Sequence, residues 1–422
     1  MRFGDRMKRA FIFFIFIFVA LTHCVKAQFL FAGEQNQITR NRPEANQLLF
    51  NIRSYCFFVD NEYKGEKTFG YTLPGFRLTP TLSFGISDKV SMEAGVSLLN
   101  YHGANKYPCS IYSFFPTWLG YQYLEGVHAV PYFKVDWHIN SDWNLSFGNI
   151  DNHDSHLLPE PLYNVEHCFA SDPENGLQLK MNKPFHKMDI WLNWQSFVFK
   201  NDIHQEAFSI GYNSQSFLDI KQDKFRMVMP ISFLAQHLGG ENLSGSFSIQ
   251  TWLNMAVGLK AEARFGSINT ALGADYLFYK QIGSGSLMPF DGGWALYPYF
   301  EFAYDDLRIK FGYYDSEDFV SLLGSPHFCN YSSNTPDLVF DRANQYYLRA
   351  TYRYDITKGC KFDAYLQTES HNGRPSGLSQ SYKRWICFVL FRSDFEHRPF
   401  HFAETLFEHK RLSIRVILNL DY

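Results

Sequence analysis

The segment 149–176 combines several imidazoles with several carboxylates, a mixture that suits a transition metal. His153 and His156 are three residues apart, which aligns two side chains on a helix but not on a strand. Two other interpretations are open: a loop that folds into a pore and narrows it, or an external loop whose polar groups satisfy its own backbone. The candidate constriction-loop residues are Asp151, His153, Asp154, His156, Glu160 and Glu166.

Common catalytic signatures do not occur in the sequence: it has no G-x-S-x-G, no H-E-x-x-H and no glycine-rich phosphate loop. Ser146 and His138 lie on adjacent predicted strands, which suggests a hydrolase at the rim of a barrel as one alternative. Such a pair arises easily by chance, because a catalytic triad is recognised by its geometry. We therefore expect no catalytic function, no cofactor and no bound metal.

The elements that must position these side chains are strands, because apolar and polar residues alternate along the whole chain. Phe133, Val135 and Trp137 share one face, while Lys134 and Asp136 share the other. A second run extends over 247–264, which is longer than most strands of soluble proteins. One face apolar and the other charged, strand after strand, is typical of a transmembrane barrel. A secreted soluble β-sandwich or β-helix is the alternative, with the apolar face as its core.

Short and long connections alternate between the predicted strands, as in barrels with short periplasmic turns and long extracellular loops. The sequence therefore predicts an all-β, antiparallel transmembrane β-barrel of about 16 strands, within a range of 14 to 18. Aromatic residues make up 18 % of the chain, which agrees with aromatic girdles at both membrane interfaces. The short turns are expected at 87–88, 140–142, 184–187, 222–223, 266–267, 305–306 and 357–359, and the longer stretches at 101–126, 151–174, 281–293, 315–342 and 371–410.

The two ends of the sequence resemble export and insertion signals. A basic start and an apolar run over 10–21 precede Val25-Lys26-Ala27, which predicts a signal peptide over 1–27. Lipidation at Cys24 is the alternative. We expect a short periplasmic segment over 28–45, the barrel over 46–422 and a location in the outer membrane of a Gram-negative cell. The expected insertion signal at the C-terminus consists of Leu418, Leu420 and Tyr422.

The polar face of the strands would line the lumen, and more of its charged residues are basic than acidic. This predicts a mild anion preference, unless the charges pair across strands and brace the wall. The lumen-lining candidates are Lys134, Asp136, Lys180, Lys260, Arg264, Arg308, Lys310, Arg349, Arg353, Lys361 and Arg415.

The favoured function is a porin-like channel for passive diffusion of small polar or anionic solutes. A structural or assembly barrel whose long extracellular loops bind partner proteins is the chief alternative. A net charge of −3 gives no reason to expect nucleic acid. The expected partners are outer-membrane lipid and lipopolysaccharide, the barrel-assembly machinery during insertion and small solutes, and a homo-oligomer is left open.

A group of residues resembles a known pattern: Gly148-Asn149, His156, the run 160–163, Glu166 and the run 174–178. This pattern is similar to that of poorly characterised, porin-like outer-membrane β-barrel proteins of Bacteroidota. The resemblance covers mainly residues 70–200. It implies compartment and fold, and it carries no catalytic residue.

Overall fold

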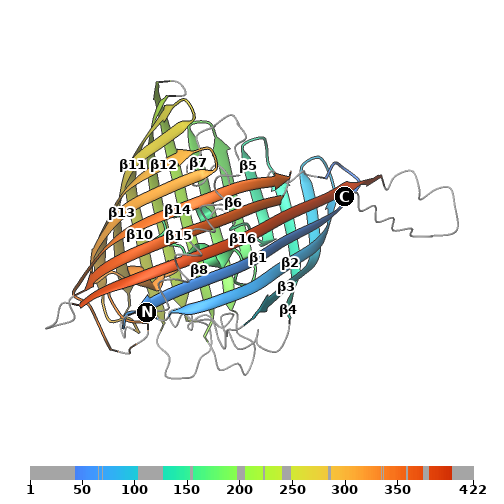
Figure 1. The fold of residues 1–422 in the computed structure, drawn as a ribbon. Coiled ribbons are helices and arrows are strands. Elements are labelled where there is room, and N and C mark those ends of the chain that lie inside the picture. Colours follow the sequence, from blue (N-terminus) through green and yellow to red (C-terminus); the bar gives the residue numbers. More distant parts are fainter. Residues whose placement is uncertain are drawn as a thin grey trace, which may run out of the picture.

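The chain forms a closed β-barrel in which every strand pairs antiparallel with its neighbours in sequence (Figure 1). Backbone groups are thereby satisfied within the wall, as a membrane-spanning sheet requires. The structure, a computed structural model, describes residues 43–401 apart from 65, 69, 103–126, 153–154, 197–204, 222–223, 240–248, 284–286, 334, 336, 358–359 and 374–379, with side chains up to residue 354 except that of Lys64.

The described part of the barrel wall has sixteen strands, the number predicted from the sequence. The strands are β1 (Gln47–Lys64), β2 (Tyr71–Gly85), β3 (Val90–Tyr101), β4 (His128–His138), β5 (Trp143–Asn149), β6 (Asn175–Lys183), β7 (His186–Ser196), β8 (Ala207–Lys221), β9 (Phe225–Leu238), β10 (Gln250–Phe265), β11 (Ile268–Ile282), β12 (Gly292–Tyr304), β13 (Leu307–Glu317), β14 (Arg342–Thr357), β15 (Cys360–Gly373) and β16 (Gln380–His401).

The barrel closes between β1 and β16, which lie side by side in Figure 1. The sequence predicts a longer stretch at 371–410 and leaves open a further hairpin within it; the structure places β16 over most of this stretch. The run 385–391 is apolar at every position, so its sequence has no two-residue alternation. The predicted insertion signal, Leu418, Leu420 and Tyr422, lies outside the described residues, as does the predicted signal peptide.

Connections of very different length alternate around the barrel, as predicted. The strand pairs β2–β3, β4–β5, β6–β7, β8–β9, β10–β11, β12–β13 and β14–β15 are joined by two to four residues. The other connections are longer, with 25 residues between β5 and β6. All short turns therefore lie at one end of the barrel, the short-turn end, and all longer connections at the other, the long-loop end.

The two faces of the wall differ as the alternation predicted. On β11, Leu272 and Phe278 point outward and are 66 % and 43 % exposed, while Asp275 and Leu277 point inward and are almost completely buried. An apolar outer face with a mixed inner face is the arrangement that lipid requires. The helical segments among the described residues are short 3-10 turns, and none is long and apolar enough to cross a membrane.

Two of the connections at the long-loop end turn back into the barrel. The first inward loop is 150–174 and the second inward loop is 318–341. Their side chains Leu162, Phe169 and Phe319 are at most 1 % exposed. The 3-10 turns η4 (Ser155–Leu157) and η5 (Val165–Cys168) belong to the first loop, and η6 (Pro326–Phe328) to the second. The inner-face side chains in the same hydrophobic cluster include Tyr55, Leu99, Trp191, Trp252, Leu277, Tyr297 and Tyr347.

Replacing Val257 by arginine tests the assignment of the two faces. Val257 lies in the middle of β10 and is 50 % exposed on the outer face. A charge there would face hydrocarbon, so we expect Val257→Arg to lower the free energy of unfolding by about 2–4 kcal/mol. Urea-dependent unfolding in lipid vesicles measures this change. The control Val257→Leu keeps the face apolar and should leave stability unchanged; equal stability of both variants would contradict the assignment.

Candidate functional site

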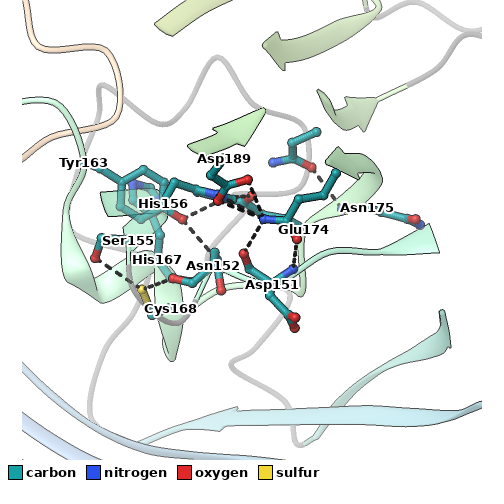
Figure 2. A network of polar contacts seen from close by, with 12 residues as sticks. Asp151, Asn152, Ser155, His156, Tyr163, His167, Cys168, Glu174, Asn175 and Asp189 are labelled. Atoms are coloured by element: carbon teal, nitrogen blue, oxygen red, sulfur yellow. Dashed lines mark hydrogen bonds and ion pairs between the residues drawn. The ribbon is translucent and has the colours of Figure 1, made fainter. Parts of the chain in front are cut away.

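His156 lies at the centre of a buried network that joins the first inward loop to the wall (Figure 2). Its Nδ1 lies 2.9 Å from Oδ2 of Asp189 on β7, and its Nε2 lies 2.8 Å from Oε2 of Glu174. The Tyr163 hydroxyl donates to the other Glu174 oxygen at 2.7 Å, and Gln178 on β6 donates to both oxygens of Asp189 at 3.0 Å. Each carboxylate is thus held by more than one donor.

The network keeps the imidazole of His156 protonated at neutral pH. Burial alone would lower its pKa, but Glu174 and Asp189 outweigh burial and raise the pKa from 6.5 to about 10. The geometry agrees, because a carboxylate oxygen can only accept and both ring nitrogens therefore donate. A general base must accept a proton, so His156 cannot take that role near neutral pH. It holds the loop in place.

The backbone at His156 is strained. Ser155, His156 and Leu157 have φ angles of +53°, +52° and +57°, the left-handed region that ordinary residues avoid. Each such residue costs roughly 1–2 kcal/mol. The imidazolium stacks on the inward ring of Trp191, with ring centroids 3.9 Å apart and planes 6° apart. This contact and the two ion pairs offset the strain.

The first inward loop reaches several other strands. Lys134 of β4 donates to Asp151 at 2.9 Å, and the Tyr71 hydroxyl of β2 donates to Glu166 at 2.6 Å. Glu160 forms an ion pair with Arg349 of β14. The structure therefore places the predicted constriction-loop residues Asp151, His156, Glu160 and Glu166 inside the barrel, while the predicted residues His153 and Asp154 lie outside the described part.

The second inward loop is fixed to the wall and to the first. Asn254 of β10 donates to the Val320 carbonyl at 2.8 Å and accepts from the Leu322 amide at 2.9 Å. Tyr163 and Leu323 form a parallel bridge between the two loops. The loops thus form one body, the plug, which spans the lumen near its long-loop end.

His167 belongs to the junction of the two loops. Its Nε2 lies 2.9 Å from the Leu323 carbonyl oxygen, which can only accept, so Nε2 carries a hydrogen. Burial lowers the pKa of His167 to about 4, and the nearby Glu174 opposes this only in part. His167 is therefore neutral at physiological pH, and its described contact links the two loops.

The predicted lumen-lining residues with described side chains point inward, and several of them form ion pairs. Lys260 lies 2.7 Å from Glu262, and Lys310 lies 3.8 Å from Glu301. Lys134 contacts Asp136 at 3.3 Å as well as Asp151. Lys180, Arg264, Arg308 and Arg353 lie on the same inner face. The side chain of Lys361 and the whole of Arg415 lie outside the described part.

The predicted alternative of a Ser146–His138 pair does not form. Ser146 lies opposite Asp136 in the β4–β5 ladder, and its hydroxyl donates to that carboxylate at 2.5 Å. His138 lies opposite Asn144, next to the short turn at 139–142. Sequence spacing placed the two residues on adjacent strands but could not give the register of those strands.

A different histidine–carboxylate pair lies at the long-loop end. Nε2 of His128, the first residue of β4, lies 3.0 Å from Oδ1 of Asp172 at the end of the first inward loop. The two side chains are 21 % and 20 % exposed, while the Oδ1 atom of Asp172 that faces His128 is buried. A carboxylate that orients an imidazole is the arrangement of a general base. Sequence reasoning missed this pair because 44 residues separate its members.

A small pocket opens beside Asp172 at the end of β7. The residues that line it include Ser171, Asp172, Asn193, Trp194 and Gln195. Within the described part of the chain, no group of three or more His, Cys, Asp or Glu side chains is arranged to hold a metal ion.

Comparison with models of protein families shows to which family the chain belongs. The model of the family described as Lipid A 3'-O-deacylase-type matches residues 38–395, which is most of the chain. The chain belongs to this family. The family is one of enzymes, so the sequence-based expectation of no catalytic function was wrong. The resemblance seen over residues 70–200 agrees with this family in part, because the family's description names a deacylase and not a porin.

Solved structures with a similar barrel have low sequence identity. A high-pH structure of Pseudomonas putida OprB has 10 % identity and a TM-score of 0.48, covering 83 % of this chain and 94 % of that chain. Acinetobacter baumannii OccAB4 has 10 % identity and a TM-score of 0.46, covering 86 % and 100 %. The outer membrane protein OpdK of Pseudomonas aeruginosa has 9 % identity and a TM-score of 0.46, covering 83 % and 100 %. No curated protein matches the chain.

The pKa of His156 predicts how stability depends on pH. The pKa is about 10 in the folded state and 6.5 ordinarily, so the stabilisation is complete below pH 6.5 and disappears as pH rises through 10. We expect the free energy of unfolding to fall across this window by up to about 1.4 kcal/mol per pH unit. Urea unfolding at a series of pH values measures it.

The variant His156→Asn should lack this pH-dependent component. His186→Asn is the matched control, because His186 is at the short-turn end and its Nδ1 lies 3.0 Å from the Ser216 hydroxyl. The control should keep the wild-type slope. If His156→Asn had the same slope as the wild type, His156 would not be the group that titrates.

Proposed function

We propose that this protein hydrolyses an acyl ester of a membrane glycolipid, in the outer leaflet of the outer membrane, at the long-loop end of the barrel. The observation that carries the proposal is membership of the Lipid A 3'-O-deacylase-type family over residues 38–395. The apolar outer wall supports it, because it would bring lipid directly to the rim where loops and wall meet.

The described residues supply a base for this reaction. Ester hydrolysis needs a group that takes a proton from water as the water attacks the carbonyl carbon. The bond to the alcohol oxygen then breaks, and the products are a carboxylic acid and an alcohol. His156 is already protonated, and His167 is buried in the plug. The pair His128–Asp172 is partly exposed and lies at the rim, so we propose His128 as the base and Asp172 as the residue that orients it.

Release of fatty acid from a purified hexa-acylated lipid A tests the proposal. We expect the refolded wild-type protein to release acyl chains, detected by mass spectrometry of the glycolipid. His128→Gln should lower the rate by at least about 100-fold, the contribution typical of a general base. His186→Gln, at the opposite end of the barrel, should keep the wild-type rate.

The outcomes test the hydrolysis and the identity of its general base separately. A folded wild-type protein that releases no acyl chain contradicts the proposed hydrolysis. Hydrolysis that His128→Gln does not slow supports the reaction and excludes His128 as its base.

A second candidate function is passive diffusion through the lumen, as predicted from the sequence. The observation in its favour is the charged inner face toward the short-turn end, where Lys260, Glu262, Glu301 and Lys310 lie. Stable single-channel steps in a planar bilayer would support this function. A folded barrel that gives no conductance steps would contradict it. The plug, which spans the lumen, would then be the reason that no solute passes.

A further inference from the structure

The end of the first inward loop contacts three neighbouring strands of the wall, β2, β3 and β4 (Figure 1). Arg77 of β2, Leu99 of β3 and His128 of β4 stand opposite one another in the two ladders that join these strands. Arg77 and His128, at the two ends of this row, both contact the loop. Because two strand spacings separate them, the loop end is held at two points about 10 Å apart.

Arg77 binds the loop through two backbone carbonyl groups. Its Nη1 donates to the carbonyl oxygen of Ser171 at 3.0 Å, and its Nη2 donates to that of Cys168 at 2.5 Å. The guanidinium lies over the ring of Tyr55, 4.8 Å from the ring centre. A guanidinium is planar and carries its donors in a fixed fork, so it holds two acceptors at a set separation. Arg77 therefore fixes both ends of the segment 168–171.

The residues between these two carbonyl groups are also held by the wall. The hydroxyl of Tyr101 on β3 donates to the carbonyl of Ala170, and the ring of Phe169 packs against that of Phe57 on β1 at 5.0 Å. A helical turn such as η5 leaves its last carbonyl groups without partners inside the turn, and donors from the wall supply them here. Asp172 is the next residue of the chain, so its position follows from these contacts.

We infer that Arg77 is a positioning residue for the proposed hydrolysis, because it holds the loop end so that the Asp172 carboxylate stays against the His128 imidazole. The inference rests on the proposed function, since it names a residue on which the proposed base depends. Arg77 is 5 % exposed and donates to loop backbone, so it acts through Asp172 and not on the substrate. A displacement of about 1 Å in a catalytic group can lower a rate about 100-fold.

The kinetics of acyl-chain release by Arg77→Met test the inference. Methionine is also long and unbranched but has no donor for the two carbonyl groups. We expect kcat to fall about 10- to 100-fold and KM to stay unchanged, because the base is displaced while substrate binding is not. Arg53→Met is the matched control, because Arg53 of β1 is also buried over a tyrosine ring, that of Tyr132, and pairs with Glu93 of β3. It should keep the wild-type kcat.

Combining Arg77→Met with Asp172→Asn shows whether Arg77 acts through Asp172. If it does, Arg77→Met costs no further activity in the Asp172→Asn protein, since the two changes remove one interaction. Arg77→Lys keeps the charge without the planar fork and should have a kcat between those of the wild type and Arg77→Met. A wild-type kcat in Arg77→Met, or the same fold loss in both backgrounds, would overturn the inference.

Hydrogen exchange separates failure of this inference from failure of the proposed function. The amides of Phe169 and Ala170 donate to the Glu166 carbonyl and should exchange slowly in the wild type. In Arg77→Met they should exchange faster, while the strand amides keep their protection and show that the barrel has folded. Unchanged exchange would overturn the inference even if the protein is a hydrolase. A wild-type protein that releases no acyl chain removes the hydrolysis, and the exchange rates still show whether Arg77 holds the loop end.

Discussion

The pairing of the His156 imidazolium with Asp189 and Glu174 is the interaction on which the interior of this barrel depends. Three consecutive residues of the first inward loop have left-handed backbone angles, and such a turn persists only where its surroundings fix it. The two carboxylates and the Trp191 ring provide those surroundings. Removing one partner would leave a charge buried without compensation, which is strongly destabilising.

The plug explains how a transmembrane barrel can work at its rim. The first inward loop is held against β7 by His156 and bridges the second loop through Tyr163 and Leu323. Near its end the same loop carries Asp172, which contacts His128 and lines the small pocket at the end of β7. The position of the proposed reactive groups therefore depends on contacts inside the barrel, although the substrate would arrive from the membrane.

Much of the wall could be predicted from the sequence, because lipid on one side and a polar interior on the other impose a period of two residues. This period placed Val257 outside and Lys260 inside, and the turns followed from its interruptions. It failed at β16, whose sequence has an unbroken apolar run over 385–391. Where apolar and polar residues do not alternate, the two-residue period cannot indicate a strand.

The interior of the site could be predicted only in part. Histidines and carboxylates in one segment predicted a loop that folds into the barrel, and His156 makes the contacts that join this loop to the wall. Its partner Asp189 could not be found, because the pairing depends on how the loop folds back on β7 and not on spacing. A signal was present in β7, where Asp189, Trp191 and Asn193 share the inner face. A tryptophan on the inner face needs apolar neighbours, and an inserted loop supplies them.

Hydrogen exchange of the amides in the two inward loops tests the central claim most directly, namely that these loops form one body held by His156. We predict that amides of 155–170 and 319–330 in the wild-type protein exchange as slowly as those of the strands. In Asp189→Asn, both segments should lose protection together while the wall keeps it. Fast exchange of these segments in the wild type, or loss of protection in the first loop alone, would contradict the account.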